Sequence, residues 1–184
     1  MRTKQVLLLM LVVALAGCSP YVFAAKETYE VAADPRSLVT QATDSEAELH
    51  IKAALVASSV SGTSGIEVYC RQGVVVLVGM VPSGSQAGRE AVKIARQTSG
   101  VKRVETYFVS HRPTWESDIG IEEQIRAVLV ADPSLVSSRV DIAVYAGHVV
   151  LVGVVDSRVN VQKFISDARA VNGVVSVTSY IQTV

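Results

Sequence analysis

The chain has 184 residues, a length that suits one or two small domains. Apolar residues make up 49% of it and charged residues 18%, a balance that is typical of a globular protein and argues against a disordered one. Lys and Arg number 17, and so do Asp and Glu, so the formal net charge is zero. Without a basic excess or a long run of Lys and Arg, the composition argues against a nucleic-acid-binding protein.

The first 17 residues have the pattern of an export signal. A short basic segment precedes an apolar run at residues 6–16, and this run is too short to span a bilayer core of about 30 Å. It ends in Leu-Ala-Gly-Cys at residues 15–18, which resembles the bacterial lipobox. In that motif the cysteine is acylated and becomes the mature N-terminus, so the resemblance predicts lipidation at Cys18. The alternative is an ordinary secretory signal with an unrelated cysteine.

Acylation at Cys18 would anchor the chain to a membrane by itself. Stable anchoring needs at least two lipid signals, and a diacyl- or triacyl-cysteine supplies them at one residue. Ser19 stands where an Asp would favour the inner membrane, so by resemblance to the sorting rule of enteric-type bacteria we expect the outer membrane, with the chain facing the periplasm. No later segment approaches the roughly 18 uninterrupted apolar residues of a membrane-spanning helix.

Most of the mature chain consists of two copies of one sequence repeat. Glu48 matches Glu122 and Gly73 matches Gly147, an offset of 74 residues, which becomes 73 after Ser83 and its counterpart in the second copy. This period exceeds that of solenoid repeats, so each copy is expected to be a domain with its own core. The resulting prediction is a lipidated N-terminus and tether at residues 18–45, a first domain at 46–110 and a second domain at 114–184.

Each copy has the pattern of five elements in the order α-β-β-α-β. Apolar residues spaced by three or four positions, such as Ile51 and Leu55, predict a first helix that packs on one face. Two apolar runs follow, with a glycine at the tight hairpin turn between them. The predicted fold class is α+β, with two helices on one face of a three-stranded mixed sheet in each domain. Second helices are expected at residues 86–98 and 160–171, and strands at 66–71, 74–81, 101–109, 140–145, 149–155 and 174–181.

Repeated glycines suggest local features of these elements. Gly79 and Gly153 interrupt the central strands and suggest a bulge or the close approach of a helix. Gly100 and Gly173 follow the second helices and are predicted to end them as C′ residues.

Cys70 is predicted to be a buried, unreactive core residue. It lies in an apolar, strand-like run and aligns with Val144 of the second copy. With Cys18 acylated, the chain offers it no disulfide partner.

The repeat resembles the BON domain. The residues that carry this resemblance are the Gly-Val-Val-Val-Leu-Val-Gly run at 73–79, its copy at 147–153, and the Gly-Val-x-x-Val closures at 100–104 and 173–177. Together with the lipobox and the Asp-Pro-Arg-Ser segment that begins at residue 34, they resemble the dual-BON outer-membrane lipoproteins. The resemblance implies a non-enzymatic protein at the inner face of the outer membrane that supports envelope integrity, with a link to cell-division sites.

The resemblance also implies that the second domain contacts anionic phospholipid through its first helix, which aligns with residues 119–130. The family carries a Trp near the position of Gly120, whereas Trp115 lies about one turn upstream. The candidate lipid-binding residues are Trp115 and Ile119 for insertion into the interface, with Arg112 and Arg126 near the head groups. The alternative is that Trp115 packs between the domains.

Charge does not favour the second domain as a purely electrostatic membrane site. Residues 114–184 hold five basic and eight acidic side chains, a net charge of −3, whereas residues 46–110 hold seven and five, a net charge of +2. A basic side chain near an anionic leaflet gains about 1 kcal/mol, so an acidic domain gains little unless its bases cluster on one side.

Nothing in the sequence supports a catalytic or metal site. His50, His111 and His148 are scattered, and no Cys or carboxylate stands at ligand spacing from them. No nucleophile elbow or phosphate loop is present, and no cofactor is expected. Two hypotheses remain: a phospholipid-binding protein at the membrane surface, and an adaptor that tethers envelope or division proteins through exposed strand edges such as residues 174–184.

Overall fold

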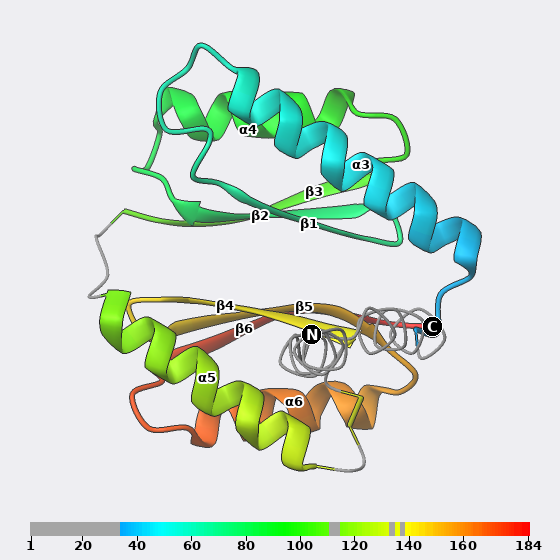
Figure 1. The fold of residues 1–184 in the computed structure, drawn as a ribbon, viewed down its shortest axis with the longest axis vertical. Coiled ribbons are helices and arrows are strands. Elements are labelled where there is room, and N and C mark those ends of the chain that lie inside the picture. Colours follow the sequence, from blue (N-terminus) through cyan, green and yellow to red (C-terminus); the bar gives the residue numbers. More distant parts are fainter. Residues whose placement is uncertain (1–33, 111–114, 133–134, 137–138) are drawn as a thin grey trace, which may run out of the picture. The chain divides into compact units, whose positions relative to one another are not determined.

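The computed structural model describes residues 34–110, 115–132, 135–136 and 139–184, and it contains two α+β domains in tandem (Figure 1). The elements of the first domain are α3 (Leu38–Ala57), β1 (Glu67–Arg71), β2 (Val74–Met80), α4 (Gln86–Gln97) and β3 (Arg103–Val109). Those of the second domain are α5 (Trp115–Ala131), β4 (Val140–Tyr145), β5 (His148–Val155), α6 (Arg158–Ala170) and β6 (Ser176–Thr183). The predicted order of elements is confirmed, and every strand lies within two residues of its predicted bounds.

Each domain has the predicted three-stranded mixed sheet. In the first domain β2 is central, antiparallel to β1 and parallel to β3, and in the second domain β5 has the same relation to β4 and β6. Helices α3 and α4 cover one face of the first sheet, and α5 and α6 cover one face of the second (Figure 1). The predicted fold class is therefore confirmed.

The central strands are almost wholly apolar, and both of their faces are covered. Val75 and Leu77 of β2 lie in the core beneath the helices of the first domain. Val76 and Val78 point to the opposite face, where they belong to a second cluster with side chains of β4 and β5. The remaining members of that cluster are Ala143, Val150 and Val152, with Tyr69, Tyr107, Tyr145 and Tyr180 packed against them.

Polar contacts between the two sheets are reciprocal. The Tyr145 hydroxyl donates to Glu67 at 2.9 Å, and the Arg71 guanidinium is paired with Asp141. Glu67 aligns with Asp141, and Arg71 aligns with Tyr145, at the 74-residue offset of the repeat. Each domain therefore offers a carboxylate and a donor at the same two positions, in the manner of an isologous interface.

A buried aspartate holds the hairpin turn of the first domain. Gln72 and Gly73 form the turn with φ of 55° and 76°, a left-handed conformation that L residues other than glycine rarely adopt. Their backbone N–H groups donate to the Asp44 carboxylate at 2.7 Å and 2.8 Å. The Asp44 side chain also accepts a bond from Arg36 at 2.6 Å.

The second domain repeats this clamp at the aligned positions. Asp118 accepts bonds from the N–H groups of Ala146 and Gly147 at 2.8 Å and 2.9 Å. Asp44 and Asp118 are both buried, and each sits in the same stripe of its helix as the apolar core residues. Both clamps compensate the strain of a non-glycine residue at the first turn position.

Helix α3 begins at Leu38, within the segment that we expected to be tether. The Ser37 hydroxyl caps it by accepting the Thr40 N–H, and the buried Asp44 ties its second turn to the sheet. The Asp-Pro-Arg-Ser segment has a structural role as well, because the Arg36 side chain forms ion pairs with both Asp34 and Asp44.

Two predictions about glycines need correction. Gly79 and Gly153 mark no bulge, because the parallel register with the third strand runs through both without a break. They mark no helix contact either, because the atoms nearest to a Cβ at each position belong to the start of the first strand or to the segment before it. A Cβ at Gly79 would lie 3.1 Å from the Gly65 carbonyl oxygen, and one at Gly153 would collide with the Arg139 carbonyl oxygen. Because glycine has no Cβ, the backbone segment that precedes the first strand of each sheet can pass close to these two positions.

Gly100 and Gly173 are not C′ residues. Thr98 caps α4, and its carbonyl oxygen accepts the Val101 N–H at 3.3 Å, so Gly100 occupies the third position of a β-turn with φ of 83°. Gly173 lies two residues beyond Val171, the C-cap of α6, and occupies the same turn position with φ of 91°.

Helix α6 begins at Arg158, two residues earlier than predicted, because Ser157 caps it by accepting the Asn160 N–H. The corresponding connection in the first domain is longer, since Ser85 caps α4 and residues 82–84 separate it from the core residue Val81.

Candidate functional site

The structure places some of the predicted lipid-binding residues. Cys18 and Arg112 lie outside the described residues. Trp115 is the first residue of α5, but its side chain lies outside the described part, so its packing stays a prediction. Ile119 and Arg126 both line one hollow of about 350 Å³, which we call the α5 hollow. Its other lining residues are Glu67, Tyr69, Met80, Asp118, Glu122, Ile142, Ala143, Val144 and Tyr145.

Two exposed apolar side chains line the α5 hollow beside its charged groups. Ile119 is 45% exposed and Met80, at the end of β2, is 49% exposed. A methionine and an isoleucine that leave half of their surface in solvent at one opening offer contact area to an apolar group. Gly120 follows Ile119 on α5, and a Cβ at that position would meet nothing within 4 Å.

The acidic groups of the α5 hollow are already engaged. Glu67 accepts bonds from the hydroxyls of Tyr69 and Tyr145 at 2.6 Å and 2.9 Å, and Glu122 pairs with Arg126 at 2.7 Å. Burial, reinforced by Glu67, raises the pKa of both tyrosines, so they remain donors at neutral pH. With Asp118 committed to its turn, the hollow offers fewer free acceptor oxygens than its composition indicates, and Arg126 offsets the charge of Glu122.

The outward surface of α5 repeats a pattern of α3. In α5, Glu122 pairs with Arg126, and Val130 follows four positions later with 71% of its surface exposed. In α3, Glu48, Lys52 and Val56 hold the aligned positions, with Lys52 paired to Glu48 at 2.7 Å and Val56 70% exposed. The half-exposed Ile119 has no apolar counterpart, because Ser45 aligns with it.

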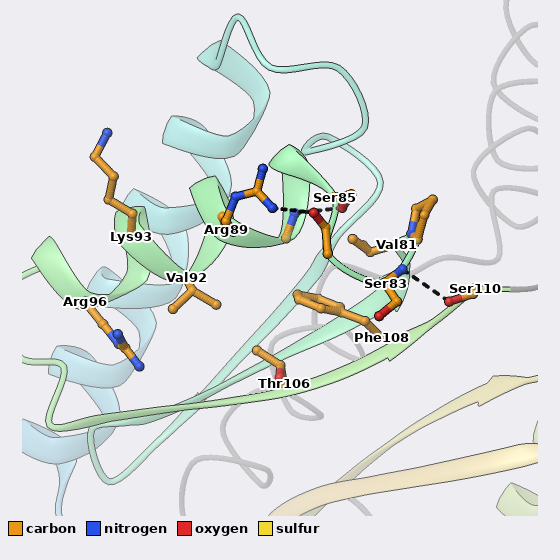
Figure 2. A pocket seen from close by; sticks show the side chains of 13 residues that line it. Val81, Ser83, Ser85, Arg89, Val92, Lys93, Arg96, Thr106, Phe108 and Ser110 are labelled. Atoms are coloured by element: carbon orange, nitrogen blue, oxygen red, sulfur yellow. Dashed lines mark hydrogen bonds between the residues drawn. The ribbon is translucent and has the colours of Figure 1, made fainter.

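A second opening, which the sequence analysis missed, lies between α4 and β3 of the first domain (Figure 2). We call it the α4–β3 groove; its volume is about 490 Å³. Arg89, Lys93 and Arg96 of α4 line it, and Thr106 and Phe108 of β3 form its opposite wall. Its other lining residues are Val81, Pro82, Ser83, Gly84, Ser85, Gly88, Val92 and Ser110.

The sequence held one signal for this groove. Arg89, Lys93 and Arg96 recur at i, i+4 and i+7, a spacing that places three cations on one face of a helix. At the aligned positions the second domain has Gln162 and Ser166, and only Arg169 remains basic.

The described residues offer no metal site and no reactive thiol. No three His, Cys, Asp or Glu side chains in this part of the chain gather closely enough to hold a metal ion. Cys70 is fully buried, as predicted, and burial with the neighbouring Asp44 raises its pKa to about 12. The thiol therefore stays protonated at physiological pH. None of the helices in the described part is long and apolar enough to cross a membrane.

Comparison with known proteins agrees with the repeat. The BON domain model matches residues 43–109 and again residues 117–184. The chain is 34% identical over 146 residues to "Osmotically-inducible protein Y" of Escherichia coli (strain K12), and the match covers 76% of this chain and 72% of that protein. The C-terminal domain of CdsD, a structural protein of the type III secretion system of Chlamydia trachomatis, is 13% identical, with a TM-score of 0.32, over 77% of this chain and 67% of that one. With a family model that matches both copies, the chain belongs to the BON-domain family.

Proposed function

We propose that this protein is an outer-membrane lipoprotein, anchored through Cys18 and facing the periplasm, that binds anionic phospholipid at the membrane surface. In this role it supports envelope integrity, including at division sites, and catalyses no reaction. The lipobox resemblance and the two BON domains support the proposal. The mature chain adds surface contact to the affinity that the acyl anchor supplies.

One observation carries the lipid-binding part of the proposal: α5 exposes apolar residues beside a cation at the opening of a hollow. Ile119, Arg126 and Val130 recur at seven and four positions, so they share one face of the helix. The first domain adds the half-exposed Met80 at the same opening. An interfacial helix binds by placing such a face at the boundary of head groups and acyl chains.

The sheet packing supports this choice of surface. The faces of the two sheets that no helix covers are buried against each other, so they are not available to a membrane. The outer surface of α5, with the hollow beside it, is exposed and can contact a bilayer.

Apolar insertion, more than charge, supplies the affinity in this proposal. Arg126 is paired with Glu122, and the second domain is net acidic, so head-group attraction is weak. Burying one aliphatic side chain contributes about 1.5–3 kcal/mol. We therefore expect binding that changes little with salt, in contrast to a polybasic surface.

The test is an NMR titration of the soluble fragment 19–184 with anionic micelles. Shifts concentrated in residues 115–130 are expected, and their absence would count against the proposal. Ile119→Asp is expected to weaken binding about tenfold, because it removes the insertion of one aliphatic side chain. The matched control is Val56→Asp on α3, an equally simple change at an exposed position of the first domain.

The anchor is tested separately. Mass spectrometry of the mature protein from cells is expected to find an acylated Cys18 as its first residue. An unmodified N-terminus beyond Cys18 would contradict the anchor, without bearing on the lipid-binding surface.

A further inference from the structure

We propose that the α4–β3 groove binds an acidic segment of a partner protein in extended conformation, which adds to the first sheet beside β3. This inference goes beyond lipid binding and involves none of the α5 residues. It rests on three features that meet at one place: an open strand edge, an adjoining groove and a row of cations.

The first feature is the free edge of β3. Among the residues that the structure describes, the order β1-β2-β3 leaves β3 without a neighbouring strand on one side. The Arg103 N–H donates to the Gly73 carbonyl at 3.3 Å, and the Val109 carbonyl accepts the Val81 N–H at 3.0 Å. Residues of a parallel strand bond alternately to either side, so the odd-numbered residues of β3 face β2.

The even-numbered residues of β3 therefore direct their backbone groups to the free edge. These are Val104, Thr106 and Phe108. The Thr106 carbonyl accepts the Tyr180 hydroxyl at 3.3 Å, and a carbonyl oxygen has a second lone pair for another donor. An added strand obtains its main-chain bonds from such an edge.

The second feature is the groove that adjoins this edge. Its volume of about 490 Å³ falls within the range of ligand clefts, about 300–1,000 Å³. Phe108 and Val92 provide apolar surface, with Thr106 beside them (Figure 2). Gly88 permits this packing, because a Cβ there would lie 3.2 Å from both the Phe108 ring and Val81.

The third feature is the charge of α4. Arg89 and Lys93 are four residues apart, which corresponds to a rise of about 6 Å along a helix. Alternate residues of a strand are spaced by about 6.6 Å, so acidic side chains at every second position match these cations in turn. Lys93 contacts Glu90 at 3.3 Å on the exposed surface, a weak pairing that a better-placed carboxylate can replace.

The second domain lacks this combination. Gln162 and Ser166 stand at the positions of Arg89 and Lys93, and Val161 stands at the position of Gly88. Val161 packs against the core of the second domain, where the first domain keeps a groove. The proposed site is therefore a property of the first domain alone.

A strand edge favours a peptide over a phospholipid head group as the occupant. Head-group phosphates would satisfy the cations but would leave the row of backbone donors and acceptors on β3 unused. An acidic extended peptide uses both, with main-chain bonds for affinity and alternate side chains for specificity.

The test uses the full mature protein and a fluorescent, acetylated peptide of sequence Thr-Glu-Val-Glu-Val-Glu-Thr, with binding followed by anisotropy. Binding is expected for this peptide and not for its counterpart with Lys in place of Glu. The double variant Arg89→Gln with Lys93→Ser, which installs the residues of the second domain, is expected to weaken binding about tenfold. Arg158→Gln on α6 is the matched control and is expected to leave it unchanged.

Strand addition has its own measurement. On peptide binding, amide hydrogen exchange at Thr106 and Phe108 is expected to slow, because their N–H groups gain acceptors. Binding without this protection would overturn strand addition. No peptide binding, together with loss of anionic-vesicle binding in the double variant, would overturn the proposal in favour of a head-group site. Ile119→Asp is expected to leave peptide affinity unchanged, so the lipid and peptide proposals fail independently.

Discussion

The two domains share a scaffold and differ in their outer surfaces. Both hold a hairpin turn with a buried aspartate, Asp44 or Asp118, and both bury the helix-free face of the sheet against the other. The differences lie on the helices: α4 of the first domain is basic beside an open edge, and α5 of the second exposes Ile119 beside a hollow. The repeated aspartates serve the fold, and side chains that differ between the copies, such as Ile119 and Arg89, are where a functional difference between the domains is to be sought.

The cores also differ in where they place their aromatic side chain. In the second domain Phe164 of α6 fills the core, and the aligned residue of the first domain is Ala91. In the first domain the phenylalanine comes from β3, as Phe108, whose counterpart is Ile181. Because the phenylalanine of the first domain lies on β3 and not on the helix, its ring forms a wall of the α4–β3 groove.

The largest expected effect tests this difference between the cores. Phe164 is 1% exposed, so Phe164→Ala is expected to lower the free energy of unfolding by about 3–5 kcal/mol. Phe108 is only partly buried, and Phe108→Ala is expected to cost less. Urea unfolding followed by far-UV circular dichroism measures both; equal losses would mean that the first domain depends on its aromatic residue as strongly as the second.

The aspartate clamps are expected to matter in both domains, and more in the first. Asp118→Ala leaves two turn N–H groups without their acceptor and is expected to cost about 2–3 kcal/mol. Asp44→Ala also removes one of the two carboxylate partners of Arg36, which keeps Asp34, and is expected to cost about 3–4 kcal/mol. The same urea experiment ranks them, with Glu46→Ala as a control on the exposed side of α3; a loss below 1 kcal/mol for either clamp would contradict its role.

A smaller loss of stability is expected when the ion pair between Arg71 and Asp141 is broken. Burial raises the pKa of Asp141, and the charge and hydrogen bond of Arg71 oppose that rise. Arg71→Ala is therefore expected to raise the Asp141 pKa further and to cost about 1–2 kcal/mol at neutral pH. Carboxyl NMR measures the titration, with Arg103→Ala, paired to Glu105, as the control.

The pH dependence of that variant has a definite sign. A carboxyl with a raised pKa in the folded state binds its proton more tightly there than in the unfolded state. Its favourable contribution to the free energy of unfolding is therefore complete below the unfolded pKa of 3.8 and is lost as pH rises through the folded pKa. The stability deficit of Arg71→Ala should thus be small in acid and grow toward neutral pH. A deficit that is independent of pH would show that the charge of Asp141 is not involved.

The smallest effect concerns Cys70. Val144 holds the aligned position, so Cys70→Val is expected to change the free energy of unfolding by less than about 1 kcal/mol. With a pKa of about 12, the native thiol is expected to resist alkylation at pH 8 and to react only after unfolding. Rapid labelling of the native protein would contradict its burial.

Much of the fold could be predicted because it depends on local patterns. The apolar stripe of Ile51 and Leu55, the glycine turns and the repeat itself determined the elements and the sheet class. The aspartate clamp could also have been predicted, since Asp44 and Asp118 are aligned and lie in the core stripe of their helices. A polar residue at such a repeated core position indicates a buried acceptor with a specific partner.

The openings could not be predicted because they depend on distant residues. The α4–β3 groove requires Arg89, Gly88 and Phe108 to meet across two elements. The α5 hollow requires Met80 of one domain beside Ile119 of the other. The nearly continuous apolar sequence of the central strands indicated that both of their faces are buried, but not that each sheet covers the other.

The reciprocal bonds between Glu67 and Tyr145 and between Asp141 and Arg71 have an evolutionary consequence. A symmetric homodimer of a single-copy ancestor would leave this pattern after gene duplication and fusion. Joining the copies replaces a bimolecular association with an effective concentration of about millimolar, so each half stays paired however dilute the protein is. The outer helices take no part in these reciprocal bonds, so in either half they can diverge toward separate ligands.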